Sequence, residues 1–144
     1  MSARPGGSTA GGSDSSTAGR ERSRSVLIVE DEALVAMFIA DLLEALDYAV
    51  CGIAASGAHA LELAELHRPR AAIVDIGLKG AIDGVETAAQ LRERFGTKCL
   101  LCSGDVGAAT EARAARAAPV AILPKPFTSA QLEAALVRTL AATG

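Results

Sequence analysis

Short apolar runs alternate with longer stretches of helical periodicity along this chain. The periodic stretches predict helices at residues 32–46, 57–67, 83–95, 106–118 and 128–142. The apolar runs predict strands at residues 26–30, 48–54, 71–75, 97–103 and 120–123. Short, continuously apolar strands separated by helices indicate a parallel sheet that is covered on both faces. The sequence therefore predicts an α/β fold, a doubly wound five-stranded parallel sheet with helices on both faces.

Two of the predicted helices carry apolar residues at helical spacing. In the helix at 32–46 these positions are Leu34, Met37, Phe38, Leu42 and Leu46. In the helix at 57–67 the same periodicity places Leu61, Ala64 and Leu66 toward the interior.

Capping residues define several helix ends. Asp83 is the predicted N-cap of the helix at 83–95, and Gly96 follows its last residue. Thr128 or Ser129 is the predicted N-cap of the final helix.

Composition divides the chain into a tail and one domain. Residues 1–24 are rich in Gly, Ser, Thr and Arg and nearly free of apolar residues, which predicts a disordered tail before a domain at residues 25–144. No secretory signal or membrane-length apolar run is visible, so a cytoplasmic protein without a membrane partner is expected. A net charge of −3 gives no basic footprint for nucleic acid. The three cysteines fit reduced thiols, and Cys99 and Cys102, three apart on one strand, should point to opposite faces of the sheet.

Polar side chains stand where four of the predicted strands end. Glu30 and Asp31 come at the end of the first strand, Asp75 ends the third, Ser103 ends the fourth and Lys125 follows the fifth. In an open parallel sheet, ligands bind beyond the carboxyl ends of the strands. We therefore expect three carboxylates, a hydroxyl and an ammonium group to converge on one rim of the sheet.

This set of groups fits a magnesium and phosphoryl site. Carboxylate oxygens are ligands that Mg²⁺ prefers, and Asp31 and Asp75 would bind the ion and leave room for a phosphoryl oxygen. Lys125 and Ser103 would then contact further phosphoryl oxygens, while one carboxylate acts as the nucleophile. Each group alone has a simpler explanation, since an Asp at a strand end is more often a helix cap. Complementary groups at four strand ends favour the functional interpretation.

The motifs that carry these groups, "VEDE", "VDIGLKGAIDGVE", "LLCSGD" and "LPKPF", identify a family resemblance. From about residue 26 to residue 141, the chain resembles a response-regulator receiver domain of two-component signalling. The resemblance implies a flavodoxin-like sheet with strand order 2-1-3-4-5. It implies that Asp75 is the phosphoacceptor and takes its phosphoryl group from a histidine kinase or phosphotransfer protein, so the chain is not a conventional enzyme.

The resemblance also implies roles for the other site residues. Asp31 would bind Mg²⁺ directly, Glu30 largely through water, and Gly77 through its backbone carbonyl. Ser103 and Lys125 would contact the phosphoryl group, and the Lys125–Pro126 bond would be cis. A downstream protein partner would bind at the helix 106–118, the strand 120–123 and the helix 128–142.

Two positions differ from the common family pattern, Ile122 and Glu30, and Glu30 replaces an Asp as the first acid, a common variant that reaches farther toward the metal. Ile122 stands where a Tyr, Phe or His often turns inward on activation, so that aromatic form of the switch is not expected. Gly77 and Asp105, two residues after Asp75 and Ser103, flank the path of attacking water, and Gly77 offers no side chain there.

Two other functions remain open from the sequence. One is an interaction module that uses the receiver fold without phosphorylation. The other is a small Mg²⁺-dependent aspartyl phosphatase, but such enzymes generally need a second acid at the position that Gly77 occupies.

Overall fold

A computed structural model describes residues 24–104 and 107–141. Within these ranges the chain alternates strands and helices in the predicted order. The strands are β1 (Ser25–Val29), β2 (Ala49–Ala54), β3 (Ala71–Asp75), β4 (Lys98–Ser103) and β5 (Ala121–Pro124). The helices are α2 (Ala33–Ala45), α3 (Gly57–His67), α4 (Gly84–Phe95), α5 (Ala108–Ala114) and α6 (Ser129–Ala141). The strands pair in parallel in the order β2-β1-β3-β4-β5, which confirms the predicted fold class.

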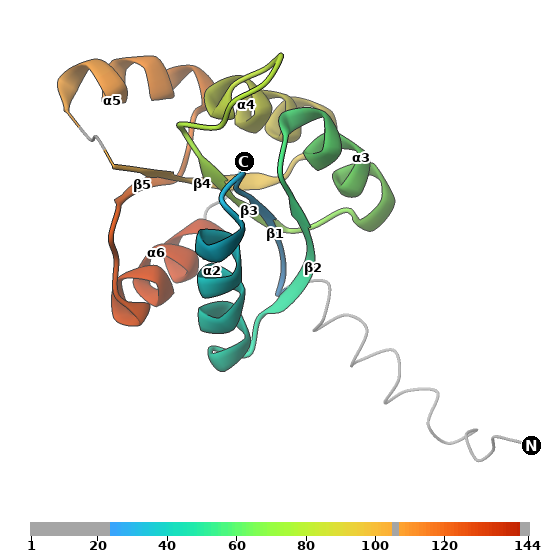
Figure 1. The fold of residues 1–144 in the computed structure, drawn as a ribbon, viewed down its shortest axis with the longest axis vertical. Coiled ribbons are helices and arrows are strands. Elements are labelled where there is room, and N and C mark those ends of the chain that lie inside the picture. The colour runs from blue at the N-terminus through green and yellow to red at the C-terminus, as the bar shows by residue number, and fades with distance from the viewer. Residues whose placement is uncertain (1–23, 105–106, 142–144) are drawn as a thin grey trace, which may run out of the picture.

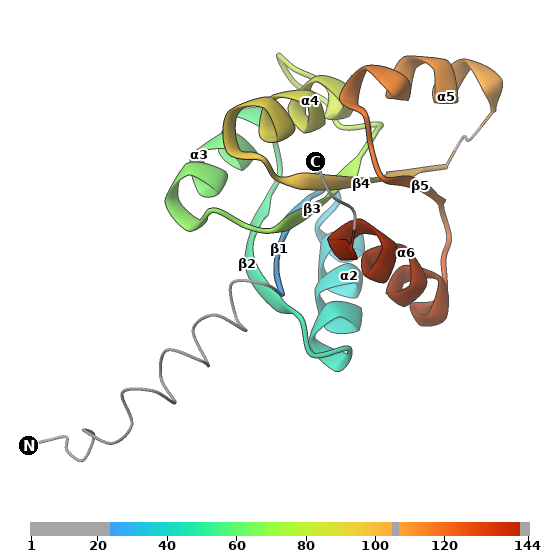
Figure 2. The same ribbon diagram turned by 180° about the vertical axis from the view of Figure 1, so that it is seen from behind.

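Helices cover both faces of the sheet, as Figures 1 and 2 show. Helices α3, α4 and α5 pack on one face, and α2 and α6 pack on the other. The core is aliphatic apart from Tyr48 and Phe127 and the cysteines, and every residue of β1 is buried. Cys99 and Cys102 belong to the cores on opposite faces, as their spacing on one strand predicted. Within the described residues, no helix has the length and apolar character needed to cross a membrane.

Three of the five apolar positions that predicted α2 lie on the surface, while Leu42 and Leu46 are half-buried against the core. The helix buries a different stripe, which is Ala36, Ile39 and Leu43. Leu34, Met37 and Phe38 are 81%, 57% and 50% exposed. The spacing of these three residues correctly predicted a helix, but the face that they mark is turned to solvent.

The position of Leu66 corrects an assignment made from the sequence. Leu66 is 73% exposed on α3, whereas the buried positions of that helix are Gly57, Ala60 and Ala64. Leu66 lies in the last turn of α3, beyond the part of the helix that contacts the sheet through small residues. The inward position predicted for Leu66 is therefore wrong, and the one predicted for Ala64 is confirmed.

Predicted caps lie at the ends of α4 and α6. The Asp83 carboxylate accepts a hydrogen bond from the Glu86 N–H, and Gly96 ends α4 with a φ of 68°. The Gln131 N–H donates to the Thr128 hydroxyl, and the Gln131 side chain accepts from the Thr128 N–H, which makes Thr128 the N-cap of α6. The helix predicted at 106–118 is shorter, because α5 ends at Ala114 and continues as a 3-10 turn.

The predicted disordered tail lies outside the described residues except for Arg24. The Arg24 guanidinium donates to the carbonyls of Leu46 and Asp47 at 2.9 and 2.7 Å and lies 4.2 Å from the centre of the Tyr48 ring. Arg24, the last residue of the predicted tail, therefore contacts the loop between α2 and β2. The division into a tail and a domain otherwise stays a prediction.

Candidate functional site

The carboxyl ends of β1, β3, β4 and β5 meet at one edge of the sheet. Strand pairing places Asp75 opposite Cys102, and Ser103 opposite Pro124. The Lys125 N–H donates to the Ser103 carbonyl at 2.9 Å, which fixes the start of the β5–α6 loop against the end of β4. Ser103 itself is buried, at 6% exposure. The register of the strands thus brings the predicted site residues to a common rim.

The Lys125 ammonium group joins two of the carboxylates. Its Nζ lies 3.0 Å from Glu30 Oε1 and 3.4 Å from Asp75 Oδ1. The Glu30 side chain is only 1% exposed, against 12% for Asp75 and 24% for Lys125. The second Glu30 oxygen accepts a hydrogen bond from the Glu32 N–H at 3.2 Å. Both oxygens of this buried carboxylate are therefore hydrogen-bonded, as burial of a charge requires.

Burial and charge shift the pKa values of this pair. Burial raises the pKa of Glu30, and the nearby Asp75 raises it further, which outweighs the hydrogen bonds from Lys125 and from the Glu32 N–H. Burial alone would lower the pKa of Lys125. The hydrogen bond to Glu30 and the charges of Asp75 and Glu30 outweigh that effect, so the pKa of Lys125 lies above its usual value. Lys125 is thus held as an ammonium ion.

Asp75 is held at the junction between β3 and α4. Its Oδ1 accepts a hydrogen bond from the Gly77 N–H at 3.0 Å. Helix α4 begins so close to this junction that a Cβ at Gly84 would stand 2.0 Å from the Asp75 carbonyl oxygen. Only glycine allows this approach, because the obstacle is backbone. The start of α4 therefore closes one side of Asp75 and leaves its carboxylate facing the rim.

Three carboxylates at the rim fit a divalent cation. One oxygen from each of Glu30, Asp31 and Asp75 lies within 4.8 Å of the others. Ligands on opposite sides of Mg²⁺ are about 4.2 Å apart, so a small inward movement brings these oxygens to coordination distance. The donor set is oxygen only, which suits a hard cation. The roles of Asp31, Glu30 and the Gly77 carbonyl as metal ligands stay predictions.

The cleft above Asp75 contains residues that the sequence analysis did not single out. Its volume is about 550 Å³, and it is lined by Asp31, Glu32, Val35, Asp75, Gly77, Lys79, Gly104 and Lys125. Glu32 and Lys79 are the charged residues among these to which the sequence analysis gave no role, although both stand within the quoted motifs. Their signal in the sequence is their place in these motifs, within four residues of a predicted site carboxylate.

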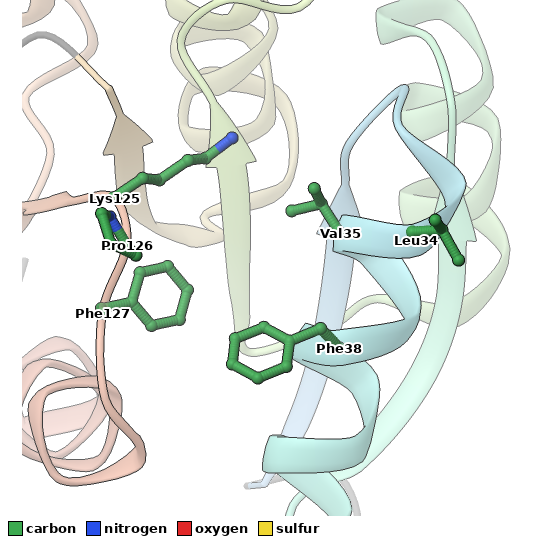
Figure 3. A pocket seen from close by; sticks show the side chains of 6 residues that line it. All are labelled: Leu34, Val35, Phe38, Lys125, Pro126 and Phe127. Carbon is green, nitrogen blue, oxygen red and sulfur yellow. The ribbon is translucent and has the colours of Figure 1, made fainter.

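An apolar groove lies directly beside this cleft. Its volume is about 450 Å³, and Figure 3 shows the residues that line it, Leu34, Val35, Phe38, Lys125, Pro126 and Phe127. The rings of Phe38 on α2 and Phe127 in the β5–α6 loop face each other, with centroids 6.3 Å apart. Groove and cleft share Val35 and Lys125. The Lys125–Pro126 bond in the wall of the groove is cis, as the resemblance implied.

Comparison with known families decides what kind of domain carries this rim. Residues 26–137 match the response regulator receiver domain. The chain belongs to this family. Receiver domains are signalling domains of two-component systems, they generally bind Mg²⁺, and they interact with histidine kinases or phosphotransfer proteins.

Individual relatives agree with this assignment. The receiver domain is 35% identical over 109 residues to the transcriptional regulatory protein PdtaR of Mycobacterium tuberculosis, covering 76% of this chain and 53% of that protein. It is 30% identical over 128 residues to the phyllosphere-induced regulator PhyR of Methylorubrum extorquens, covering 85% of this chain and 47% of that protein. The chain thus spans about half the length of these relatives.

Solved structures show the same fold. The signal receiver domain of a modulated diguanylate cyclase from Desulfovibrio desulfuricans is 37% identical, with a TM-score of 0.76 over 81% of this chain and 92% of that one. The receiver domain of the putative response regulator NarL from Mycobacterium tuberculosis is 27% identical, with a TM-score of 0.76 over 83% of this chain and 97% of that one.

We expect Glu30→Gln to stabilise the receiver domain at neutral pH when divalent cations are removed. Because its pKa is raised on folding, Glu30 binds a proton more tightly in the folded than in the unfolded state. The free energy of unfolding therefore falls as the pH rises from the ordinary pKa of 4.5 through the folded one. Glutamine removes this loss, so the variant should melt on the order of a few degrees above wild type at pH 7.

Thermal unfolding from pH 4 to pH 8 in the presence of a chelator tests this expectation. The melting temperatures of wild type and Glu30→Gln should converge at the acidic end. Glu133→Gln, which removes an exposed carboxylate on α6, is the matched control and should follow the wild-type profile. A Glu30→Gln variant that is less stable than wild type at pH 7 would show that the ionised Glu30 stabilises the fold.

Proposed function

We propose that this receiver domain accepts a phosphoryl group on Asp75 from a histidine kinase or phosphotransfer protein, in a Mg²⁺-dependent step. The observation that carries the proposal is the position of the Asp75 carboxylate. It faces an open cleft, lies 3.4 Å from the Lys125 ammonium and shares a cluster of carboxylate oxygens with Glu30 and Asp31. A nucleophilic carboxylate, a cation and oxygen ligands for a metal are the parts that phosphoryl transfer needs.

The metal would be held by Asp31 and Asp75, with Glu30 acting through water and Gly77 through its carbonyl. When bound, Mg²⁺ offsets the charge of the carboxylates and of the incoming phosphoryl oxygens. A carboxylate oxygen of Asp75 then attacks phosphorus while the N–P bond to the donor imidazole breaks. The bonding electron pair stays with the imidazole nitrogen, which needs no further reactant, and the product is an aspartyl phosphate.

Lys125 and Ser103 would contact the oxygens of the phosphoryl group on Asp75. Lys125 already lies within contact distance of Asp75 Oδ1, so exchange of a carboxylate for a phosphoryl oxygen requires only a short movement. Lys125 leads through Pro126 into Phe127 and α6, which connects this movement to the proposed output surface at α5, β5 and α6. Ile122 is half-buried against the core under α3, α4 and α5, and it has no polar ring to take part in the switch.

Two alternative functions have less support. A phosphatase would need a second acid beside the nucleophile, and Gly77 contributes only its N–H to Asp75. An interaction module without phosphorylation would not require the Lys125 ammonium group to lie between Glu30 and Asp75 at an open cleft. Cytoplasmic location stays a prediction.

We expect Asp75→Asn to abolish phosphorylation. The change keeps the size of the side chain and removes the nucleophilic oxygen. Intact-mass measurement after incubation with acetyl phosphate and Mg²⁺ should show the added phosphoryl group on wild type and none on the variant. Asp83→Asn is the matched control, because Asp83 lies in the same β3–α4 connection and asparagine also caps a helix. Equal labelling of Asp75→Asn and wild type would refute the assignment of the phosphoacceptor.

A protein phosphodonor would also contact the apolar groove. To reach Asp75, the phosphohistidine of the donor must enter the cleft. The donor surface around that histidine then covers the receiver surface beside the cleft. The groove borders it through Val35 and Lys125. Leu34, Met37 and Phe38 extend this apolar surface along α2, at the i, i+3 and i+4 spacing that a partner helix packs against. We therefore propose that a helix of the donor packs on the groove.

Phe38→Ala should separate protein donors from small donors. Loss of the ring from the groove should slow transfer from a phosphorylated histidine kinase by about tenfold, as truncation of an interface anchor does. Labelling by acetyl phosphate, which needs only the cleft, should change by less than about twofold. The measurement uses the host kinase that transfers fastest to wild type.

Leu66→Ala is the matched control for Phe38→Ala. Leu66 is also an exposed large side chain, but it lies on α3, on the other face of the sheet. Leu66→Ala should leave the rate of transfer from the kinase and the rate of labelling by acetyl phosphate unchanged. Equal slowing with the kinase and with acetyl phosphate would place the effect of Phe38 in the cleft and exclude the groove as a donor surface.

A further inference from the structure

The loop that follows Asp75 directs every second residue outward. Ile76 and Leu78 are buried, at 5% and 3% exposure, while Gly77 and Lys79 between and after them are exposed. The Leu78 N–H donates to the Asp75 carbonyl at 3.2 Å, which holds the loop against the end of β3. Anchored in this way, the loop presents Lys79 to the cleft, where it forms part of the lining together with Asp75.

Gly77 adds no side chain to this part of the cleft. Gly77 is the other outward residue of the loop, and a Cβ built there would have Asp75 Oδ1 as its nearest neighbour, at 3.5 Å. Within residues 24–104 and 107–141, no carboxylate forms an ion pair with Lys79. Lys125, in contrast, is paired with Glu30 and Asp75. Among the described residues, the charge of Lys79 therefore has no direct partner that neutralises it.

Lys79 changes the net charge of the groups around the cleft. Asp31, Glu32 and Asp75 line the cleft, and Glu30 lies beside them under Lys125. Within the part of the chain that the structure describes, these four carboxylates against the two ammonium groups leave two negative charges, which is the charge that one Mg²⁺ offsets. Without Lys79 the rim would bind a cation more tightly and would repel an anionic donor more strongly.

We propose that Lys79 sets the charge of the cleft, so that it weakens Mg²⁺ binding and favours the approach of the anionic phosphodonor. This role rests on the proposed function of Asp75. The charge of Lys79 weakens the binding of Mg²⁺ and strengthens the binding of the anionic phosphodonor. A residue that only supported the fold would, when replaced, weaken the binding of both.

The test compares Lys79→Gln, Lys79→Arg and Arg138→Gln with wild type. Arg138→Gln is the control for net charge, because Arg138 lies in the last turn of α6. At that end of α6, the Leu140 carbonyl accepts a hydrogen bond from Arg70, which stands just before β3. Asp75 is the last residue of β3, so Arg138 lies near the end of the strand that is opposite to the cleft. Two quantities are measured at low ionic strength: the Kd for Mg²⁺ by calorimetry, and the KM for acetyl phosphate by intact mass.

Lys79→Gln should lower the Kd for Mg²⁺ about three- to tenfold and raise the KM for acetyl phosphate by a similar factor. Lys79→Arg and Arg138→Gln should match wild type in both quantities. The differences should shrink as salt is added, because the side chain is exposed. A Lys79→Gln variant that equals wild type, or whose Kd and KM both rise, overturns the proposal.

These outcomes separate this inference from the proposed function. If wild type binds Mg²⁺ and takes up a phosphoryl group, then an unchanged Lys79→Gln variant refutes the role of Lys79 alone. If wild type binds no Mg²⁺ or takes up no phosphoryl group, both proposals are overturned.

Discussion

The hydrogen bond between Lys125 and the buried Glu30 is the interaction on which the site depends. The two residues are 95 positions apart in the chain, and their side chains meet at 3.0 Å. Glu30 follows β1 and Lys125 follows β5, and β3 and β4 lie between those strands in the sheet. The contact forms only if all four strands end at the same level. A buried carboxylate without this cation would carry the full cost of an uncompensated charge.

The same interaction makes the site responsive. Glu30, Asp75 and Lys125 form a set in which two carboxylates share one ammonium group. A new anion beside Asp75 would compete for Lys125, and a new cation beside Glu30 and Asp75 would relieve the repulsion between them. The arrangement is therefore stable enough to fold but remains sensitive to the two charged ligands that a receiver domain handles. Because Lys125 also borders the apolar groove, such a change would reach the surface that a protein donor covers.

Sequence patterns predicted the sheet and the rim because both depend on strong local signals. A strand such as β1 that is buried throughout leaves few alternatives, and polar residues at the ends of parallel strands must meet at one edge. The sequence did not determine which side of α2 is buried. Leu34, Met37 and Phe38 form one apolar stripe and Ala36, Ile39 and Leu43 form another, and periodicity cannot choose between them. Packing chose the stripe with the small Ala36. Lys79 was missed because its direction depends on how Leu78 anchors the loop, which no motif encodes.

The most direct test of the central claim follows Lys125 during activation. The claim is that Lys125 leaves Glu30 for the phosphoryl group and carries the change into β5, α5 and α6. Backbone amide resonances are recorded before and after phosphorylation by acetyl phosphate and Mg²⁺, in wild type and in Lys125→Ala, with intact mass confirming that each is phosphorylated. We predict that phosphorylated wild type shows shifts across β5 and the adjoining helices, and that Lys125→Ala is phosphorylated more slowly and shows almost none of them. The full set of shifts in phosphorylated Lys125→Ala would contradict this claim.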